Sequence, residues 1–107
     1  MNPEELYLVA VRARHETMRW LLLLTMNIAR PAEAHLGMLR TVMAGEYPDV
    51  TEMEVRRELD YLQGRNLITL HTDPLGRVSA KLERYGIDIL EYTVDCEAGI
   101  SRPRAGS

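Results

Sequence analysis

The chain has 107 residues and a formal net charge of -3 at pH 7; 46% of its residues are apolar and 27% are charged. This length suits one domain, and the composition is typical of a folded chain rather than a disordered one. The longest apolar run, residues 20–24, is far shorter than the roughly 20 residues that a membrane-spanning helix needs. The single cysteine, Cys96, has no internal disulfide partner, so we expect a cytoplasmic protein.

The first predicted element is a long helix over residues 3–29. Asn2 is a suitable N-cap, Pro3 fits the first turn, and Glu4 and Glu5 face the positive end of the helix dipole. Apolar and small residues then recur at helical spacing on one face: Leu6, Val9, Ala10, Ala13, Thr17, Trp20, Leu21, Leu24 and Ile28. Such a helix is about 40 Å long, which exceeds the ~34 Å diameter expected for a compact chain of this size.

The first half of this helix should therefore extend beyond the rest of the monomer. Its apolar residues would lie in water, so we interpret Leu6, Val9, Ala10 and Ala13 as a homodimer interface. The alternative is a kink near Arg14 that folds the segment back onto its own domain.

Two further helices are expected before residue 67, where the apolar pattern becomes that of a strand. Residues 32–44 have Leu36, Leu39, Val42 and Met43 on one side and end at Gly45. The next helix, residues 51–63, has the clearest local signals: Thr51 and Glu54 form a capping box, and Val50 and Val55 occupy the two positions of a hydrophobic staple. It should keep Val55, Leu59 and Leu62 inward and end at Gly64 in the left-handed cap position.

From residue 67 the apolar period becomes two, which predicts a β-hairpin over residues 67–82. Asp73-Pro74-Leu75-Gly76 is the turn. Ile68, Leu70, Val78, Ala80 and Leu82 form the apolar face that should lie against the helices. The pattern over residues 83–92 predicts a short helix that Gly86 interrupts, so the domain covers residues 1–92 and residues 93–107 form a C-terminal tail. We expect the part of this tail after Glu97 to be loose.

Three helices followed by a hairpin, with a short turn between the second and third helices, are the layout of a winged helix-turn-helix domain. The predicted fold class is thus mainly α (α+β), with a long N-terminal helix, a two-stranded wing and a short C-terminal helix. The passage Leu59-Asp-Tyr-Leu-Gln-Gly-Arg-Asn-Leu-Ile68 resembles the entry to the wing in bacterial repressors of the multiple-antibiotic-resistance and arsenical-resistance types. Residues 82–90 are similar to the segment after their wing, with Glu83 replacing the usual threonine.

The whole chain also resembles small winged-helix-like proteins from the early regions of Mu-like transposable bacteriophages. The residues that carry this likeness include Tyr85-Gly86-Ile87-Asp88 and the tail Gly99-Ile100-Ser-Arg-Pro103. The resemblance implies the fold more than an activity.

In the usual docking mode, the third helix enters the major groove and the wing contacts phosphate. This predicts a DNA-binding transcriptional regulator. The predicted contacts on the helix and its end are Arg56, Arg57, Gln63 and Arg65, and those on the wing are His71, Arg77 and Lys81.

The charge balance weakens this prediction and leaves an alternative open. The pI is about 5.6, and the acids Glu52, Glu54, Glu58 and Asp60 share the third helix with the arginines. We expect Glu54 to serve the cap and Glu58 to pair with Arg57 or with the second helix. The alternative is a non-enzymatic protein-interaction module on the same scaffold.

No catalytic or metal site is expected. His15, His35 and His71 are far apart in the sequence and form no metal-ligand spacing with Cys96. Cys96 lies between Asp95 and Glu97, acids that disfavour a reactive thiolate. We therefore predict a protein without enzymatic activity or cofactor, with duplex DNA and a second copy of itself as partners.

Overall fold

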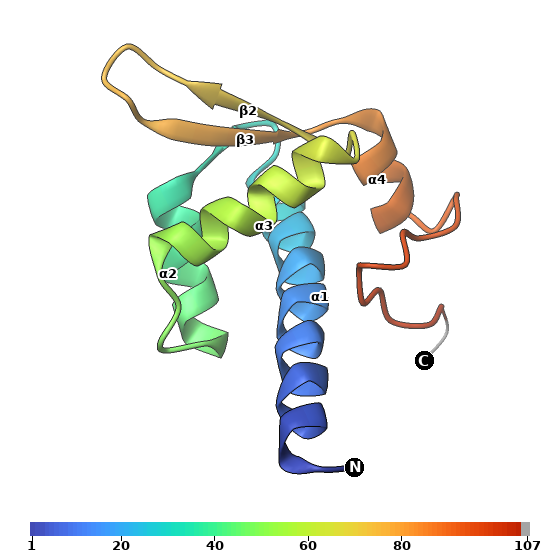
Figure 1. Cartoon of the computed structure of the whole chain (residues 1–107). Coiled ribbons are helices and arrows are strands. Elements are labelled where there is room, and N and C mark those ends of the chain that lie inside the picture. Colours follow the sequence, from blue (N-terminus) through green and yellow to red (C-terminus); the bar gives the residue numbers. More distant parts are fainter. Residues whose placement is uncertain (106–107) are drawn as a thin grey trace.

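The computed structural model describes residues 1–105 and contains helices and one antiparallel sheet. In chain order the elements are α1 (Pro3–Ala29), β1 (Ala34–His35), α2 (Leu36–Glu46), α3 (Glu52–Gly64), β2 (Ile68–Thr72), β3 (Val78–Leu82) and α4 (Arg84–Leu90). The sheet has the order β1-β3-β2 and lies across one end of the helices (Figure 1). The predicted α+β class is confirmed.

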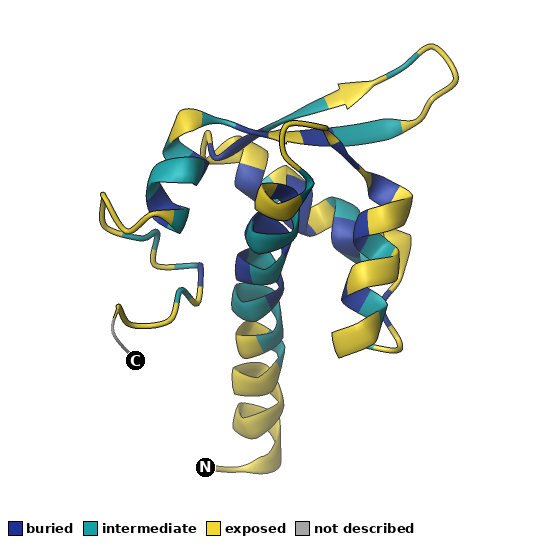
Figure 2. Cartoon of the chain, turned by 180° about the vertical axis from the view of Figure 1, so that it is seen from behind, coloured by how far each residue is buried: buried dark blue, intermediate teal, exposed yellow. Residues whose placement is uncertain are grey.

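Helix α1 is continuous over the predicted range, and its first half stands clear of the other elements (Figure 2). The side chain of Asn2 accepts a hydrogen bond from the backbone N–H of Glu5 at 2.7 Å, as a helix cap should. Residues 1–10 are all exposed. The predicted protrusion is therefore confirmed, and the alternative of a kink near Arg14 is wrong.

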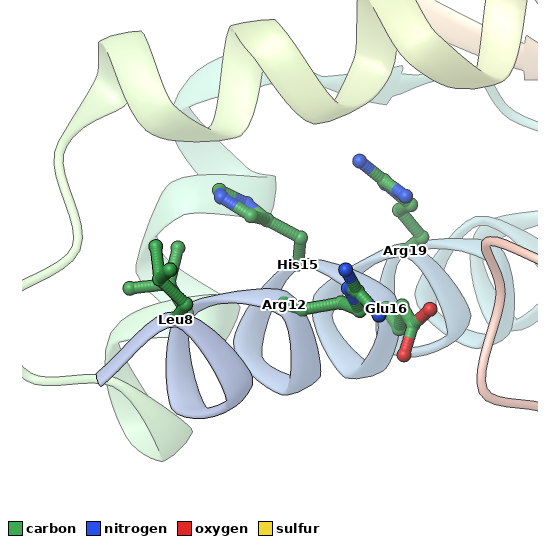
Figure 3. A pocket seen from close by; sticks show the side chains of 6 residues that line it. Leu8, Arg12, His15, Glu16 and Arg19 are labelled. Atoms are coloured by element: carbon green, nitrogen blue, oxygen red, sulfur yellow. The ribbon is translucent and has the colours of Figure 1, made fainter. Parts of the chain in front are cut away.

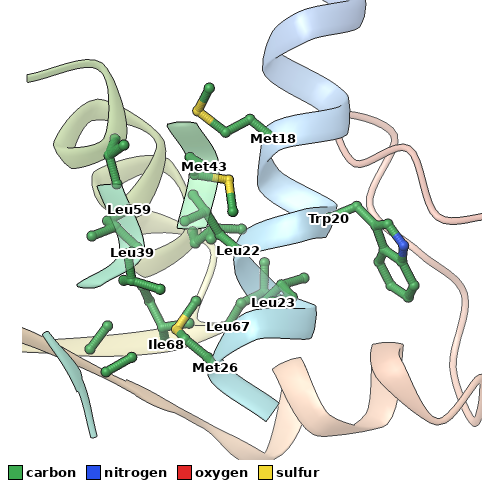
Figure 4. Packing of buried hydrophobic residues seen from close by; sticks show 14 of the residues in the cluster. Met18, Trp20, Leu22, Leu23, Met26, Leu39, Met43, Leu59, Leu67 and Ile68 are labelled. Carbon is green, nitrogen blue, oxygen red and sulfur yellow. The ribbon is translucent and has the colours of Figure 1, made fainter. Parts of the chain in front are cut away.

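The face of α1 that enters the core is not the face with the regular apolar spacing. Figure 4 shows the buried cluster between α1, α2, α3 and the sheet. The buried residues of α1 are Met18, Trp20, Leu22, Leu23 and Met26. Among these only Trp20 belongs to the predicted face, although Leu21 and Leu24 of that face are partly buried against the core. The apolar run of residues 20–24 surrounds the helix, so periodicity alone could not tell which side is covered.

The second helix was predicted to start too early. Residues 34–35 are extended and pair with β3, with Ala34 opposite Ala80 and His35 opposite Ser79, and the helix begins only at Leu36. A strand of two residues is too short to show an alternating pattern. Val42 was expected inward but is 46% exposed, whereas the other three residues of its predicted face are buried.

Helix α3 starts as predicted but uses its capping residues differently. Thr51 accepts the backbone N–H of Glu54 at 3.1 Å, and Val50 and Val55 are both buried. The carboxylate of Glu54 binds Arg14 of α1 instead of returning to the cap. At the other end Gly64 remains helical, and the left-handed residue is Asn66, with φ of 67°.

The β2–β3 hairpin confirms the predicted apolar face. Ile68 pairs with Leu82, Leu70 with Ala80, and Thr72 with Val78. The apolar members of these pairs therefore share the sheet side that packs on the helices.

The tail after α4 is not loose, and this prediction is wrong for the described residues. It runs back beside α1, where the backbone N–H of Ser101 donates to the carbonyl of Glu16 at 3.1 Å (Figure 1). Ile100 is only 5% exposed and joins the core. A single buried residue between polar and small neighbours gives no periodic signal.

Candidate functional site

The most distinctive surface feature is a groove between α3, the start of α2 and the turn of the hairpin. It consists of two adjoining hollows of about 410 and 550 Å³. Their shared lining residues are Leu36, Glu52, Gly76 and Val78. The smaller hollow also includes Arg77, and the larger includes Met53 and Arg56. The fold thus brings together two arginines that the sequence places 21 positions apart.

Both arginines of the groove are held at their Nε atoms by acids, one by the exposed Asp60 and the other by the half-buried Asp73. Arg56 Nε lies 3.2 Å from Asp60 Oδ1, and Arg77 Nε lies 2.6 Å from Asp73 Oδ2. A guanidinium has five N–H donors, so each bond leaves the terminal amino groups for a ligand. Ion pairs with this exposure contribute little to stability and can be exchanged for a partner's anions.

The hairpin turn that carries Arg77 is fixed by Asp73. Its Oδ1 accepts the backbone N–H groups of Leu75 and Arg77, each at 2.9 Å. These bonds, that from the backbone of Arg77 above all, lower the pKa of Asp73. Gly76 completes the turn with φ of 81°, a value that favours glycine. The position of Arg77 at the groove is therefore set by the turn itself.

Two other predicted contacts, Arg57 and Arg65, are exposed and have no carboxylate partner among residues 1–105. Arg57 Nη2 lies 3.5 Å from the sulfur of Met53. The guanidinium of Arg65 lies 4.4 Å from the ring centroid of Tyr61. Both keep an accessible positive charge on or beside α3.

The remaining predicted DNA contacts are engaged within the chain or lie elsewhere. Gln63 accepts the backbone N–H of Leu70 at 2.7 Å, which ties α3 to β2. His71 Nδ1 lies 2.7 Å from Glu33. Lys81 is exposed but borders a different hollow of about 240 Å³, beside Arg30. These three residues are not gathered at the groove.

The predicted interface residues of α1 are all accessible. Leu6 is 60% exposed, Val9 is 50% exposed, and Ala10 and Ala13 are also exposed. They lie on the part of α1 that stands clear of the other elements (Figure 2).

The sequence reading missed a polar cluster between α1 and α3. Glu58 is 3% exposed and binds Arg19 and His15, rather than Arg57 or the second helix as predicted. Figure 3 shows His15 and Arg19 along one side of α1, where they also border an open hollow of about 450 Å³. Glu58 lies on the same side of α3 as Val55, Leu59 and Leu62, and an acid on an apolar face is the signal that indicates a buried partner.

Other chemistry-bearing groups do not form a second site in the described chain. Burial raises the pKa of the Cys96 thiol, with a smaller contribution from Glu97, so burial more than the acidic neighbours disfavours the thiolate. Within residues 1–105, histidine, cysteine and acidic side chains do not gather in threes at metal-binding distance. No helix in this part of the chain combines the length and the apolar character needed to cross a bilayer.

Comparison with known proteins found no matching family model, curated protein or solved structure. The groove, its charges and its place in the fold are therefore the features that indicate a function.

Proposed function

We propose that the chain is a winged-helix transcriptional regulator that binds duplex DNA in the cytoplasm, without enzymatic activity or cofactor. The order of elements, with β1 before α2 and α3 before the hairpin, supports a winged helix, as does the sheet order β1-β3-β2. The observation that carries the DNA proposal is the groove where Arg56 of α3 and Arg77 of the wing line adjoining hollows. The resemblance to Mu-like phage proteins supports the winged-helix fold and a phage or prophage origin rather than an activity.

In this proposal α3 enters the major groove, which is wide enough for one helix. Arg56 and Arg57 contact guanine or phosphate, because a guanidinium matches both acceptors. Arg77 contacts phosphate from the wing. Glu52, which lines both hollows, fits the amino group of cytosine, the base that carboxylates read in the major groove.

The net charge sets the strength of binding. Nonspecific affinity comes mainly from neutralising phosphates, and a chain with a net charge of -3 has few cations to spare. We expect weak binding of mixed-sequence duplex DNA by one copy, with an affinity that falls as salt increases by a slope set by the small number of phosphates contacted. Fluorescence anisotropy at low and moderate salt measures both properties, and absence of binding at low salt would refute the proposal.

A double variant that reverses two charges tests whether α3 contacts the DNA. Arg56→Glu with Arg57→Glu should abolish the anisotropy change and leave the melting temperature nearly unchanged, because both side chains are solvent-accessible. Arg12→Glu with Arg104→Glu is the matched control, since it changes the net charge equally at exposed sites on α1 and the tail. Equal losses in both double variants would show a general charge effect and not contact by α3.

A protein partner is the second candidate, and exposed apolar residues near the groove favour it. Met53 is 64% exposed and lines the groove, and Leu75 in the hairpin turn is 78% exposed. The ion pair between Arg56 and Asp60 makes this part of α3 nearly neutral. If DNA fails to bind at low salt, Met53→Lys in a pull-down from host extract distinguishes a partner at this groove from one elsewhere.

A further inference from the structure

One side of α1 carries an uncharged stripe along nearly the whole helix. It is exposed at Leu6, Ala10, Ala13 and Ile28 and half-buried between them, where Leu21 and Leu24 also pack against the core of their own chain. Its members are spaced by three or four positions and none is fully buried: Leu6, Ala10, Ala13, Thr17, Leu21, Leu24 and Ile28. At 3.6 residues per turn they fall within an arc of about 80°. The stripe spans about 33 Å from Leu6 to Ile28, and Ile28 at its far end is 84% exposed.

The spacing of the stripe is symmetric about Thr17. Leu6 and Ile28 lie eleven positions on either side of it, Ala10 and Leu24 lie seven, and Ala13 and Leu21 lie four. If a second α1 is laid antiparallel with the two Thr17 residues together, each alanine meets a leucine. Large side chains then lie opposite small ones, which is how two apolar surfaces interdigitate.

A parallel arrangement lacks this complementarity. It would place alanine on alanine and leucine on leucine, leaving gaps at one level and crowding at another. It would also bring the first-turn acids Glu4 and Glu5 of both copies together. In the antiparallel arrangement these acids lie near Arg30 of the second copy, and the two helix dipoles oppose each other.

We propose that a second copy of this chain docks antiparallel on the α1 stripe, forming a two-fold homodimer with the paired Thr17 residues at its axis. A two-fold interface uses the same patch on both copies, which a stripe symmetric about its own centre satisfies. This keeps Leu6, Ala10 and Ala13 of the predicted interface, leaves out Val9, which lies off the stripe at 3.6 residues per turn, and extends the interface along the full helix with an assigned direction. The proposal goes beyond DNA contact, and its tests contain no DNA, so either proposal can fail alone.

Crosslinking tests the direction, in a Cys96→Ser background that removes the native thiol. Leu6→Cys combined with Ile28→Cys should give a covalent dimer with a short bismaleimide, and Leu6→Cys alone should not. The two sites are about 33 Å apart within one chain, so the link can form only between copies. A crosslink from Leu6→Cys alone would indicate a parallel pair and overturn the proposal, as would the absence of any crosslink.

Sedimentation analysis tests whether the α1 stripe is the dimer interface. Wild-type protein should sediment as a dimer, and Ala13→Glu with Ile28→Glu should give a monomer with an unchanged circular dichroism spectrum, because both sites are exposed. Met38→Glu with Val42→Glu is the control on the exposed apolar side of α2, where the residues are 40% and 46% exposed; it should remain a dimer. A monomeric wild type, or a dimer that survives the α1 substitutions, would reject this interface.

Discussion

Arg19 of α1 donates from Nε to Glu58 of α3 at 2.7 Å, across the boundary between the protruding helix and the rest of the domain. The same guanidinium donates to the carbonyl of Gly99 in the tail at 2.9 Å and lies 3.6 Å from the ring centroid of Tyr61. One side chain thus joins α1, α3 and the tail. Because Glu58 is almost fully buried, Arg19 and His15 supply the polar contacts that water would otherwise give its carboxylate.

Removing the carboxylate of Glu58 should lower the free energy of unfolding substantially. Glu58→Ala leaves Arg19 partly buried without its acid and should lower the free energy of unfolding by roughly 3 kcal/mol, the scale for breaking a buried pair. Asp60→Ala on the same helix removes an exposed pair and should cost less than about 1 kcal/mol. Urea denaturation measures both, and similar losses would contradict the structural role of Glu58.

Gly86 is expected to tolerate no side chain. A Cβ at this position would collide with the carbonyl oxygen of Leu67 and lie 3.1 Å from Leu82 Cδ2. Gly86→Ala should destabilise by about 1–3 kcal/mol through overpacking. Gly45→Ala, in a helix with no atom within 4 Å of the added Cβ, should instead stabilise by up to about 1 kcal/mol. Thermal melts of the two variants should therefore shift in opposite directions.

The docked tail should contribute to stability through Ile100. Removing its buried side chain in Ile100→Ala should cost about 2–4 kcal/mol because a cavity remains in the core. Val94, which is 36% exposed, supplies the comparison, and Val94→Ala should have a much smaller effect. Equal unfolding free energies for the two variants would mean that the tail is not packed in solution.

The hydrogen-bonded carboxylate of Asp73 in the hairpin turn should make the free energy of unfolding depend on pH in the acidic range. Its pKa is lowered by the hydrogen bonds from the backbone and side chain of Arg77 and the backbone of Leu75, so the ionised form stabilises the folded state. This contribution is complete above the ordinary aspartate value of about 3.9 and is lost as pH falls through the lower folded value. The stability difference between wild type and Asp73→Asn should be constant near neutral pH and shrink only in strong acid. A difference that already shrinks between pH 7 and 5 would exclude this carboxylate as its source.

The residues at the groove show which parts of the candidate site could be predicted from the sequence. Arg56 and Arg77 were found from the sequence because outward positions on a capped helix and on an alternating strand follow from local periodicity. Gln63 and His71 were also predicted as DNA contacts, but their partners are the backbone of Leu70 and the carboxylate of Glu33. Whether a polar side chain is free depends on what the fold places beside it.

Local chemistry determined the elements whose signals lie within a few residues of one another. Thr51 and Val55 fixed the start of α3, Asp73 and Gly76 fixed the turn, and the alternation from Ile68 to Leu82 fixed the side of the hairpin that meets the helices. These signals are readable because capping, turn and pleat geometry act over one to five residues.

Tertiary structure alone decided which side of α1 is covered, that residues 34–35 form an edge strand, and that the tail docks. Each depends on a partner far away in the chain: Glu58 for Arg19, Ala80 for Ala34, and Glu16 for Ser101. A helix that is apolar on more than one side, a two-residue strand and a lone buried isoleucine carry no periodic pattern. Packing between distant segments of the chain sets the positions of these three elements. Patterns among neighbouring residues carry no information about such packing.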